Sequence, residues 1–266
     1  MTDDEPEFSC LQLARDGAVD WLTLSRPHRL NAITGTMVSE LNAYFQGLPE
    51  RPQTRVVILQ GAGRGFCGGM DIFESLEGDG LLQSAFEDRG TPGLEDLVKW
   101  MRACPQPIIA LVNGPAAGAG LILALAADLR ILSTTAVFKT AFIKLGASGC
   151  ELGVSYLLPR IVGAGPAAEM IYSGRAIDAA RASAMGLGSE VVPPEGLREA
   201  GAALAADLLE ASPLGLRRTK ETLNLCLDLA SLDAVMAVEH RTQLRLAGPD
   251  HRSRLAAFAA AKARDT

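Results

Sequence analysis

Two apolar strands in this sequence each lead into a turn made almost entirely of glycine and alanine. The stretch "RVVIL" at 55–59 leads into "GAGRGFCGGM", and "PIIALV" at 107–112 leads into "NGPAAGAGL". Each turn is followed by what reads as the start of a helix, whose first amides have no partner and are positively polarised. Two such turns can aim backbone N–H groups at one carbonyl oxygen that gains charge during a reaction. The alternative is that both are tight strand-to-helix turns whose small residues serve packing alone.

The first turn also satisfies the dinucleotide pattern G-x-G-x-x-G over Gly63–Gly68. That motif requires a second strand ending in Asp or Glu about twenty residues later, to bind the ribose hydroxyls. The segment 74–93, "ESLEGDGLLQSAFEDRGTPG", mixes acids and glycines without a period, and its acids end no apolar strand. The sequence therefore disfavours a dinucleotide site and predicts a mobile segment here.

Composition excludes several classes of protein. The chain has 266 residues and a net charge of -6, which argues against a nucleic-acid face because that would need a basic stripe. The five cysteines are scattered, with no C-x-x-C and no histidine at metal-ligand spacing, which predicts a reduced chain without a metal. The opening "MTDDEPEF" is acidic, unlike a signal peptide, and no apolar stretch reaches the length of a membrane span. We expect a cytoplasmic protein that binds neither membrane nor nucleic acid.

The order of periodic segments predicts an α/β protein with a helical C-terminal region. An alternating hairpin, a helix over 34–48 and two buried strands come first, and after residue 160 the pattern becomes helical. We divide the chain into a disordered N-terminus (1–7), a core domain (8–196) and a C-terminal helical region (197–266).

Several motifs, in this order, resemble the crotonase (enoyl-CoA hydratase/isomerase) superfamily over roughly residues 18–225. They are "LSRPHRLNAI", "VVILQGAGRGFCGGMDI", "NGPAAGAGLILALAADLRI", "VSYLLPRIVG", "SGRAIDAARASAMGLGSEVV" and "SPLGLRRTK". The resemblance implies a spiral of repeated ββα units, a C-terminal region used for oligomerisation, and a homotrimer or dimer of trimers. It also implies an acyl-CoA thioester substrate. No separate cofactor is expected, because coenzyme A is part of the substrate.

The same resemblance implies an oxyanion site for the thioester carbonyl. Carried onto this sequence, the two amide donors belong to Met70 and to Ala119, where the family usually has glycine. Alanine keeps its N–H, so this departure matters only where the turn needs a positive φ. An enolate forms from a thioester only where its oxygen is stabilised as it gains charge, so the fold predicts acyl-CoA chemistry better than it predicts one reaction.

Both glutamates that family hydratases use to hold and activate water are replaced. Their positions hold Ile122 and Phe142, which can neither give nor take a proton. Glu151 is the acid that remains nearby, and it matches an acidic position of members that shuttle protons, such as dienoyl-CoA isomerases. In a pocket bounded by Ile122 and Phe142 its pKa would rise toward neutrality, whereas the alternative is a surface or helix-capping carboxylate. Cys67 and Cys150 flank the turns but lack a paired base, which disfavours a thiol nucleophile.

The resemblance further predicts the residues that contact coenzyme A. Arg29 would contact phosphate, the backbone of Leu30 and Ala32 the adenine, and Lys220 a phosphate of the same or a neighbouring subunit. Gly68, Asp71 and Ile72 complete this set at the first turn, although helix capping or loop hydrogen bonding is the simpler interpretation of Asp71.

Three functions stay open at this point. Because one carboxylate suits a proton shift better than water addition, an isomerase is favoured on mechanism. A hydratase is favoured by resemblance, in fatty-acid or related acyl-CoA metabolism. The third is a catalytically silent acyl-CoA-binding protein, suggested by the loss of both glutamates.

Overall fold

A computed structural model describes residues 8–73 and 93–263. It contains a six-stranded sheet in the order β1-β2-β3-β4-β6-β9 and a three-stranded sheet in the order β5-β7-β8. The strands are β1 (Leu11–Asp16), β2 (Val19–Leu24), β3 (Val56–Gly61), β4 (Ile108–Val112), β5 (Pro115–Ala117), β6 (Leu129–Ser133), β7 (Val137–Lys139), β8 (Ile177–Asp178) and β9 (Glu190–Val192). The predicted hairpin is β1 paired with β2 in antiparallel register, and β2, β3, β4, β6 and β9 then run parallel.

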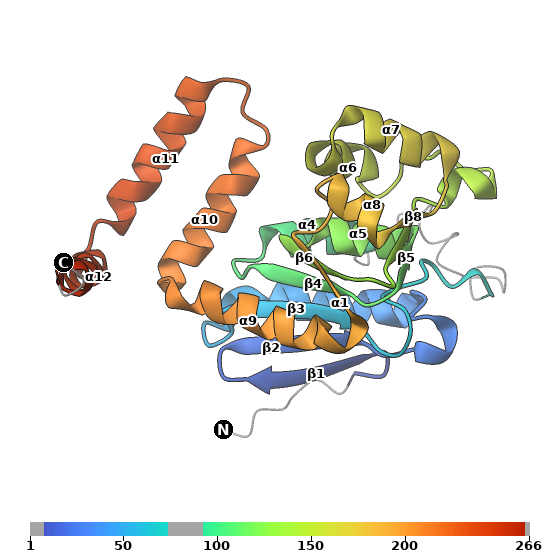
Figure 1. Cartoon of the computed structure of the whole chain (residues 1–266), viewed down its shortest axis with the longest axis horizontal. Helices are drawn as coiled ribbons and strands as arrows, with labels where there is room; N and C mark the ends of the chain where they lie inside the picture. Colours follow the sequence, from blue (N-terminus) through green and yellow to red (C-terminus); the bar gives the residue numbers. More distant parts are fainter. Residues whose placement is uncertain (1–7, 74–92, 264–266) are drawn as a thin grey trace.

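Helices cover the sheet and continue beyond it (Figure 1). They are α1 (Gly35–Gly47), α4 (Leu94–Ala103), α5 (Ala119–Ala126), α6 (Val154–Val162), α7 (Ala164–Ser173), α8 (Ala179–Ala184), α9 (Leu197–Glu210), α10 (Pro213–Cys226), α11 (Leu232–Leu246) and α12 (Pro249–Lys262). The Thr34 hydroxyl accepts the Met37 N–H at 3.1 Å, which caps α1 at its start, within the segment 34–48 predicted to be helical.

Apolar side chains fill both faces of the large sheet, as expected for parallel strands. Along β3 the side chains alternate, so Val57 and Leu59 join the larger core with α1, α4 and α5. Val56 and Ile58 point to the opposite face, where α9 contributes Leu197 and Ala205. The strands are thus held from both sides, which fixes the turns that follow their carboxyl ends.

Helix α9, the first helix of the predicted C-terminal region (197–266), packs against the large sheet. Because Leu197 and Ala205 are buried against the sheet, α9 belongs to the core by its contacts. Helices α11 and α12 project away from the sheet at the left of Figure 1, and α10 joins them to the core. The three helices carry exposed apolar side chains, namely Leu214, Leu223, Leu225, Leu227, Leu232, Met236, Leu244, Leu255 and Phe258.

The predicted disorder of residues 1–7 and the predicted mobility of 74–93 fall outside the described residues, apart from Gly93, the N-cap of α4. Among the residues of 8–73 and 93–263, none of the helices is both long and apolar enough to cross a membrane. Within the same ranges, His, Cys, Asp and Glu side chains form no group of three that could hold a metal ion.

Candidate active site

The first glycine turn is held against the segment that precedes α1. The Ile33 N–H donates to Gly69 O at 2.7 Å, and the Asp71 N–H donates to Ile33 O at 2.9 Å. This is a parallel bridge between Ile33 and Met70. In such a bridge the flanking peptide groups make both hydrogen bonds, so the N–H of Met70 itself points away from Ile33. Within the described part of the chain, that N–H donates no hydrogen bond.

The second glycine turn ends at the first amide of α5. Gly118 has φ +51° and precedes Ala119, the first residue of the helix. The hydrogen bonds of α5 begin with the Ile122 N–H, which donates to Gly118 O at 3.2 Å. Ala119 therefore presents one of the amides that a helix leaves unpaired at its start. It does not have a positive φ, so alanine replaces the family's glycine without strain.

The two turns lie against each other. The Cys67 N–H donates to Pro115 O and the Ala117 N–H donates to Cys67 O, both at 3.0 Å. A methyl group built on Gly69, whose φ is +98°, would come within 2.8 Å of Ala117 O and 3.8 Å of Ala119 N. Glycine is required here because the backbones approach so closely. The peptide that carries the Met70 N–H is consequently next to the one that carries the Ala119 N–H.

Apolar side chains surround this pair of amides. Ile122 is 1% exposed within α5, and Phe142 is 6% exposed at the start of the 3-10 helix η3 (Phe142–Leu145). The Phe142 ring lies 3.7 Å from a methyl group built on Gly118, so it borders the second turn directly. Neither side chain can carry a proton, and both lower the local dielectric response around a charge.

Glu151 lies just before α6 and is half-buried. Burial raises the pKa of its carboxyl group, and the negative charge of Glu95, in the first turn of α4, raises it further. The alternative of a helix cap is not realised, because the N-cap of α6 is Gly153 and no side chain caps it. Among the described residues the carboxylate has no hydrogen-bond or ion-pair partner. A carboxyl group whose pKa is raised holds its proton more readily than an ordinary glutamate does, which makes Glu151 a candidate for proton transfer.

Strained backbone conformations gather around these positions. In the described ranges, four residues other than glycine have a positive φ, and each costs on the order of 1–3 kcal/mol. They are Leu30, Asn31, Ala141 and Leu152. Ala141 precedes Phe142 and Leu152 follows Glu151, while the other two lie in the segment that holds the first turn. The fold thus accepts strain where it positions the candidate site.

The segment "RPHRLNA", whose backbone is predicted to contact adenine, makes several internal hydrogen bonds. The Leu30 N–H donates to Pro27 O at 3.2 Å, and the Ala32 N–H donates to Arg29 O at 3.0 Å. Leu30 O accepts the Gly68 N–H at 2.8 Å. The amide donors of Leu30, Ala32 and Gly68 are therefore used within the fold. Their part is to fasten the first turn to the segment before α1.

The side chains predicted to contact coenzyme A near the first turn differ in their exposure to solvent. Arg29 is exposed, and its guanidinium carbon lies 4.8 Å from the centre of the Phe73 ring, which is 63% exposed. Ile72 is 55% exposed. Both remain available to a ligand. Asp71 is 5% exposed and accepts the Phe73 N–H at 3.2 Å, which realises the simpler interpretation of loop hydrogen bonding.

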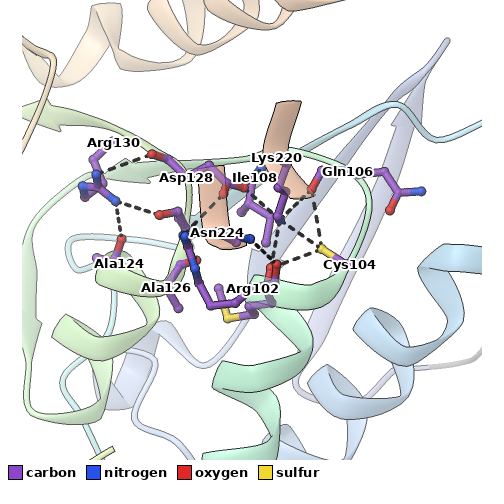
Figure 2. Close-up of polar contacts among 12 residues, drawn as sticks. Arg102, Cys104, Gln106, Ile108, Ala124, Ala126, Asp128, Arg130, Lys220 and Asn224 are labelled. Carbon is purple, nitrogen blue, oxygen red and sulfur yellow. Dashed lines mark hydrogen bonds and ion pairs between the residues drawn. The ribbon is translucent and has the colours of Figure 1, made fainter. Parts of the chain in front are cut away.

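Lys220 is buried in the interior, which corrects its prediction as a phosphate contact (Figure 2). Its ammonium group lies 2.9 Å from Asp128 Oδ2. It also donates at 2.9 Å to Met101 O and to Gln106 O, so its three protons are taken. The cause is the docking of α10 at the amino ends of the parallel strands, where buried carbonyls and Asp128 need a cation.

Sequence reasoning missed two residues that organise the first turn. Asn31 is fully buried, and its Nδ2 donates to Ala62 O at 2.9 Å and to Gly65 O at 2.8 Å. The Cys67 thiol donates to Asn31 O at 3.1 Å, and burial raises the pKa of that thiol to about 12, so it stays a donor. The other missed residue is Arg26, which pairs with Asp71 at 3.0 Å. An asparagine within a turn-forming stretch of sequence was the signal that could have identified Asn31.

Comparison with known proteins places this geometry in one family. The enoyl-CoA hydratase/isomerase family model matches residues 14–260. The chain is 41% identical over 228 residues to a Mycobacterium bovis protein described as an enoyl-CoA hydratase, covering 84% of this chain and 79% of that one. It is 35% identical over 245 residues to the 1,2-epoxyphenylacetyl-CoA isomerase of Escherichia coli, covering 90% and 91%.

A solved structure adds the same fold with a ligand. It is a Thermobifida fusca protein described as an enoyl-CoA hydratase, in complex with acetoacetyl-CoA. It superposes with a TM-score of 0.77 at 35% identity, covering 90% of this chain and 95% of that one. The protein belongs to the enoyl-CoA hydratase/isomerase family, the crotonase superfamily. It is an enzyme of that family with the crotonase fold, as the sequence motifs predicted.

Proposed function

We propose that this protein is an acyl-CoA isomerase that moves a double bond by shifting a proton through a thioester enolate. The Met70 and Ala119 N–H groups would bind the thioester oxygen, and the Glu151 carboxylate would carry the proton. For a 3-enoyl-CoA, Glu151 removes a proton from C2 and the electron pair of that bond forms the enolate, whose charge rests on the oxygen. The proton returns at C4, the double bond moves to C2–C3, and the enzyme is regenerated.

The observation that carries this proposal is the apolar character of two buried positions that follow the second turn. The two positions that would hold a water between carboxylates are Ile122 and Phe142, both buried. Glu151, just before α6, is the acid to which we assign the proton transfer, and its pKa is raised by burial and by Glu95. One proton carrier supports a shift along the acyl chain, whereas water addition needs a second group to activate the water.

The adjacency of the two unpaired amides supports the oxyanion site. Gly69 lets the backbones approach so that Ala119 N lies 3.8 Å from the position of a methyl group on residue 69. Two donors aimed at one oxygen stabilise an enolate best in a site that excludes water, which the apolar surroundings favour. The acetoacetyl-CoA complex of the Thermobifida fusca relative supports an acyl-CoA thioester as the ligand class.

Product analysis with two substrates tests the proposal. Wild type and Glu151→Gln are incubated separately with a 2-enoyl-CoA and a 3-enoyl-CoA, and products are identified by mass spectrometry and chromatography. We expect wild type to interconvert the two double-bond isomers without gaining the mass of water, and Glu151→Gln to lose at least about a hundredfold in kcat. A hydrated product would establish a hydratase instead. Binding with no product at all would favour the silent acyl-CoA binder.

We also propose that copies of this chain assemble through α10, α11 and α12 into a trimer or a dimer of trimers. Their exposed leucines, Met236 and Phe258 form apolar surface that a second copy would bury. Sedimentation equilibrium of the full chain tests this, with Leu223→Glu and Phe258→Glu as variants expected to shift the mass toward the monomer. A monomeric wild type would contradict it.

A further inference from the structure

Arg26 joins the segment before α1 to the first glycine turn through a nearly buried ion pair. Its Nη1 lies 3.0 Å from Asp71 Oδ2 and donates to Ala32 O at 2.6 Å. The Arg26 side chain is 18% exposed and that of Asp71 is 6% exposed. A charge-assisted hydrogen bond with so little access to water is among the stronger contacts a side chain can make.

The arginine starts from a fixed backbone. The Arg26 N–H donates to Asn31 Oδ1 at 2.9 Å, and Arg26 O accepts the Asn31 N–H at 2.9 Å. Asn31 in turn holds the carbonyls of the glycine turn. Asn31 therefore holds both the backbone of Arg26 and the glycine turn that leads to Asp71. This leaves the Arg26–Asp71 ion pair little freedom to move.

Asp71 directly follows Met70, the residue whose N–H would bind the thioester oxygen. Its own N–H is bonded to Ile33 O, and its carboxylate is bonded to Arg26 and to the Phe73 N–H. The peptide planes on either side of Met70 are thereby set by bonds from residues 69 and 71. The geometry points to Arg26 as a positioning residue: by holding Asp71, it fixes the direction of the Met70 N–H in the oxyanion site. This inference rests on the proposed function.

The expected effect falls on the chemical step rather than on binding. Without Arg26, the Asp71 carboxylate would lose a charge-assisted hydrogen bond, and the peptide that carries the Met70 N–H would be held less firmly. A small misplacement of one oxyanion donor costs about tenfold to a hundredfold in kcat. The coenzyme A part of the ligand would bind as before, because the guanidinium group of Arg26 contacts Ala32 O and Asp71 within the fold.

Acetoacetyl-CoA provides a direct optical test, because its enolate absorbs in the near ultraviolet and forms on binding only where its oxygen is stabilised. We would compare wild type, Arg26→Met and Arg26→Lys for kcat and KM on a 3-enoyl-CoA, for the Kd of free coenzyme A, and for the bound-enolate absorbance. We expect Arg26→Met to lose about tenfold or more in kcat and to lose enolate absorbance, with KM and the Kd of coenzyme A within about twofold. Arg26→Lys should recover part of both losses, since one nitrogen makes both contacts.

Two further variants keep the result interpretable. Arg15→Met removes an arginine that also pairs with a buried aspartate, Asp20, and we expect it to leave the enolate signal unchanged. If Arg26→Met does not fold, Asp71→Asn breaks the same ion pair while keeping an oxygen for the Phe73 N–H, and it should show the same loss. Full enolate absorbance and kcat in Arg26→Met or Asp71→Asn would overturn the inference, as would a loss confined to coenzyme A affinity. No enolate signal in wild type would instead refute the proposed oxyanion site, and this inference with it.

Discussion

The ammonium group of Lys220 lies 2.9 Å from the carboxylate of Asp128, which also accepts the Ile108 N–H at 2.8 Å. This relationship anchors α10 where β4 and β6 begin, at the end of the sheet opposite to the glycine turns. A cation from the C-terminal helices thus joins a polar cluster in which Asp128 also pairs with Arg102 of α4, at 3.4 Å.

Lys220→Met should destabilise the fold by about 3 kcal/mol, because removal of one partner leaves Asp128 without its closest cation. The free energy of unfolding in urea measures this, and limited proteolysis should cut the chain near α10 sooner. Lys144→Met removes an exposed lysine and is expected to change stability little. Equal unfolding midpoints for the two variants would show that the ion pair contributes nothing.

Ala119→Pro should abolish most of the activity while leaving the fold intact. Proline is well tolerated at the first position of a helix, yet it removes the N–H that would bind the thioester oxygen. We expect kcat to fall by about 100- to 1,000-fold. Ala119→Gly keeps the N–H and serves as the matched control, with activity near that of wild type. Comparable kcat for proline and glycine at this position would exclude the amide from the reaction.

The pH dependence of kcat/KM should report Glu151. As a base it must be ionised, so activity falls as pH drops through its pKa, which burial and Glu95 raise above the ordinary glutamate value. Glu95→Gln removes a neighbouring negative charge and should move this acid limb to lower pH. Glu199→Gln, on the exposed face of α9, should leave the limb in place. An unmoved limb in Glu95→Gln would separate Glu95 from the titrating group.

Glu151→Gln should be more heat-stable than wild type at neutral pH. Since the folded state raises the pKa of this carboxyl, its ionised form opposes folding above the folded-state pKa. Below the pKa of the unfolded chain the group is protonated in both states, so that cost disappears. Melting temperatures of the two proteins should therefore converge in acid and diverge as pH rises. A constant difference across pH would point to a cause other than ionisation.

Gly69→Ala tests the close approach of the two turns. Its new methyl group would meet Ala117 O at 2.8 Å and would require a φ of +98°, so the turn must shift. We expect a loss of about a hundredfold in kcat, from displaced donors. Gly17→Ala also occupies a positive φ but meets nothing within 4 Å, in a hairpin remote from the site. It should lower stability alone, and a similar kcat loss there would indicate general unfolding instead.

Local patterns predicted the elements and the two glycine turns, because each depends on residues close in sequence. The strand leading to Gly61, the helix over 34–48 and the apolar helix after Gly118 all follow from composition and period. The role of "RPHRLNA" could not be predicted in this way. The Arg26–Asp71 and Asn31–Ala62 contacts join residues 45 and 31 positions apart, and only the folded chain brings them together.

Lys220 illustrates the same limit for charge. An exposed lysine and a buried one are identical in sequence, and the helix that carries Lys220 is otherwise rich in exposed polar residues. Its burial depends on three acceptors that lie in α4, just before β4 and just before β6. No pattern of sequence spacing connects these acceptors with Lys220. The surface that α9 covers could not be predicted either, since its apolar face alone does not identify the surface against which it packs.

Helix α5 has all eight of its residues buried. Mobile ions cannot surround such a helix, so the field at its amino end escapes Debye screening. Added electrolyte should therefore leave the field of α5 at its first turn nearly unchanged.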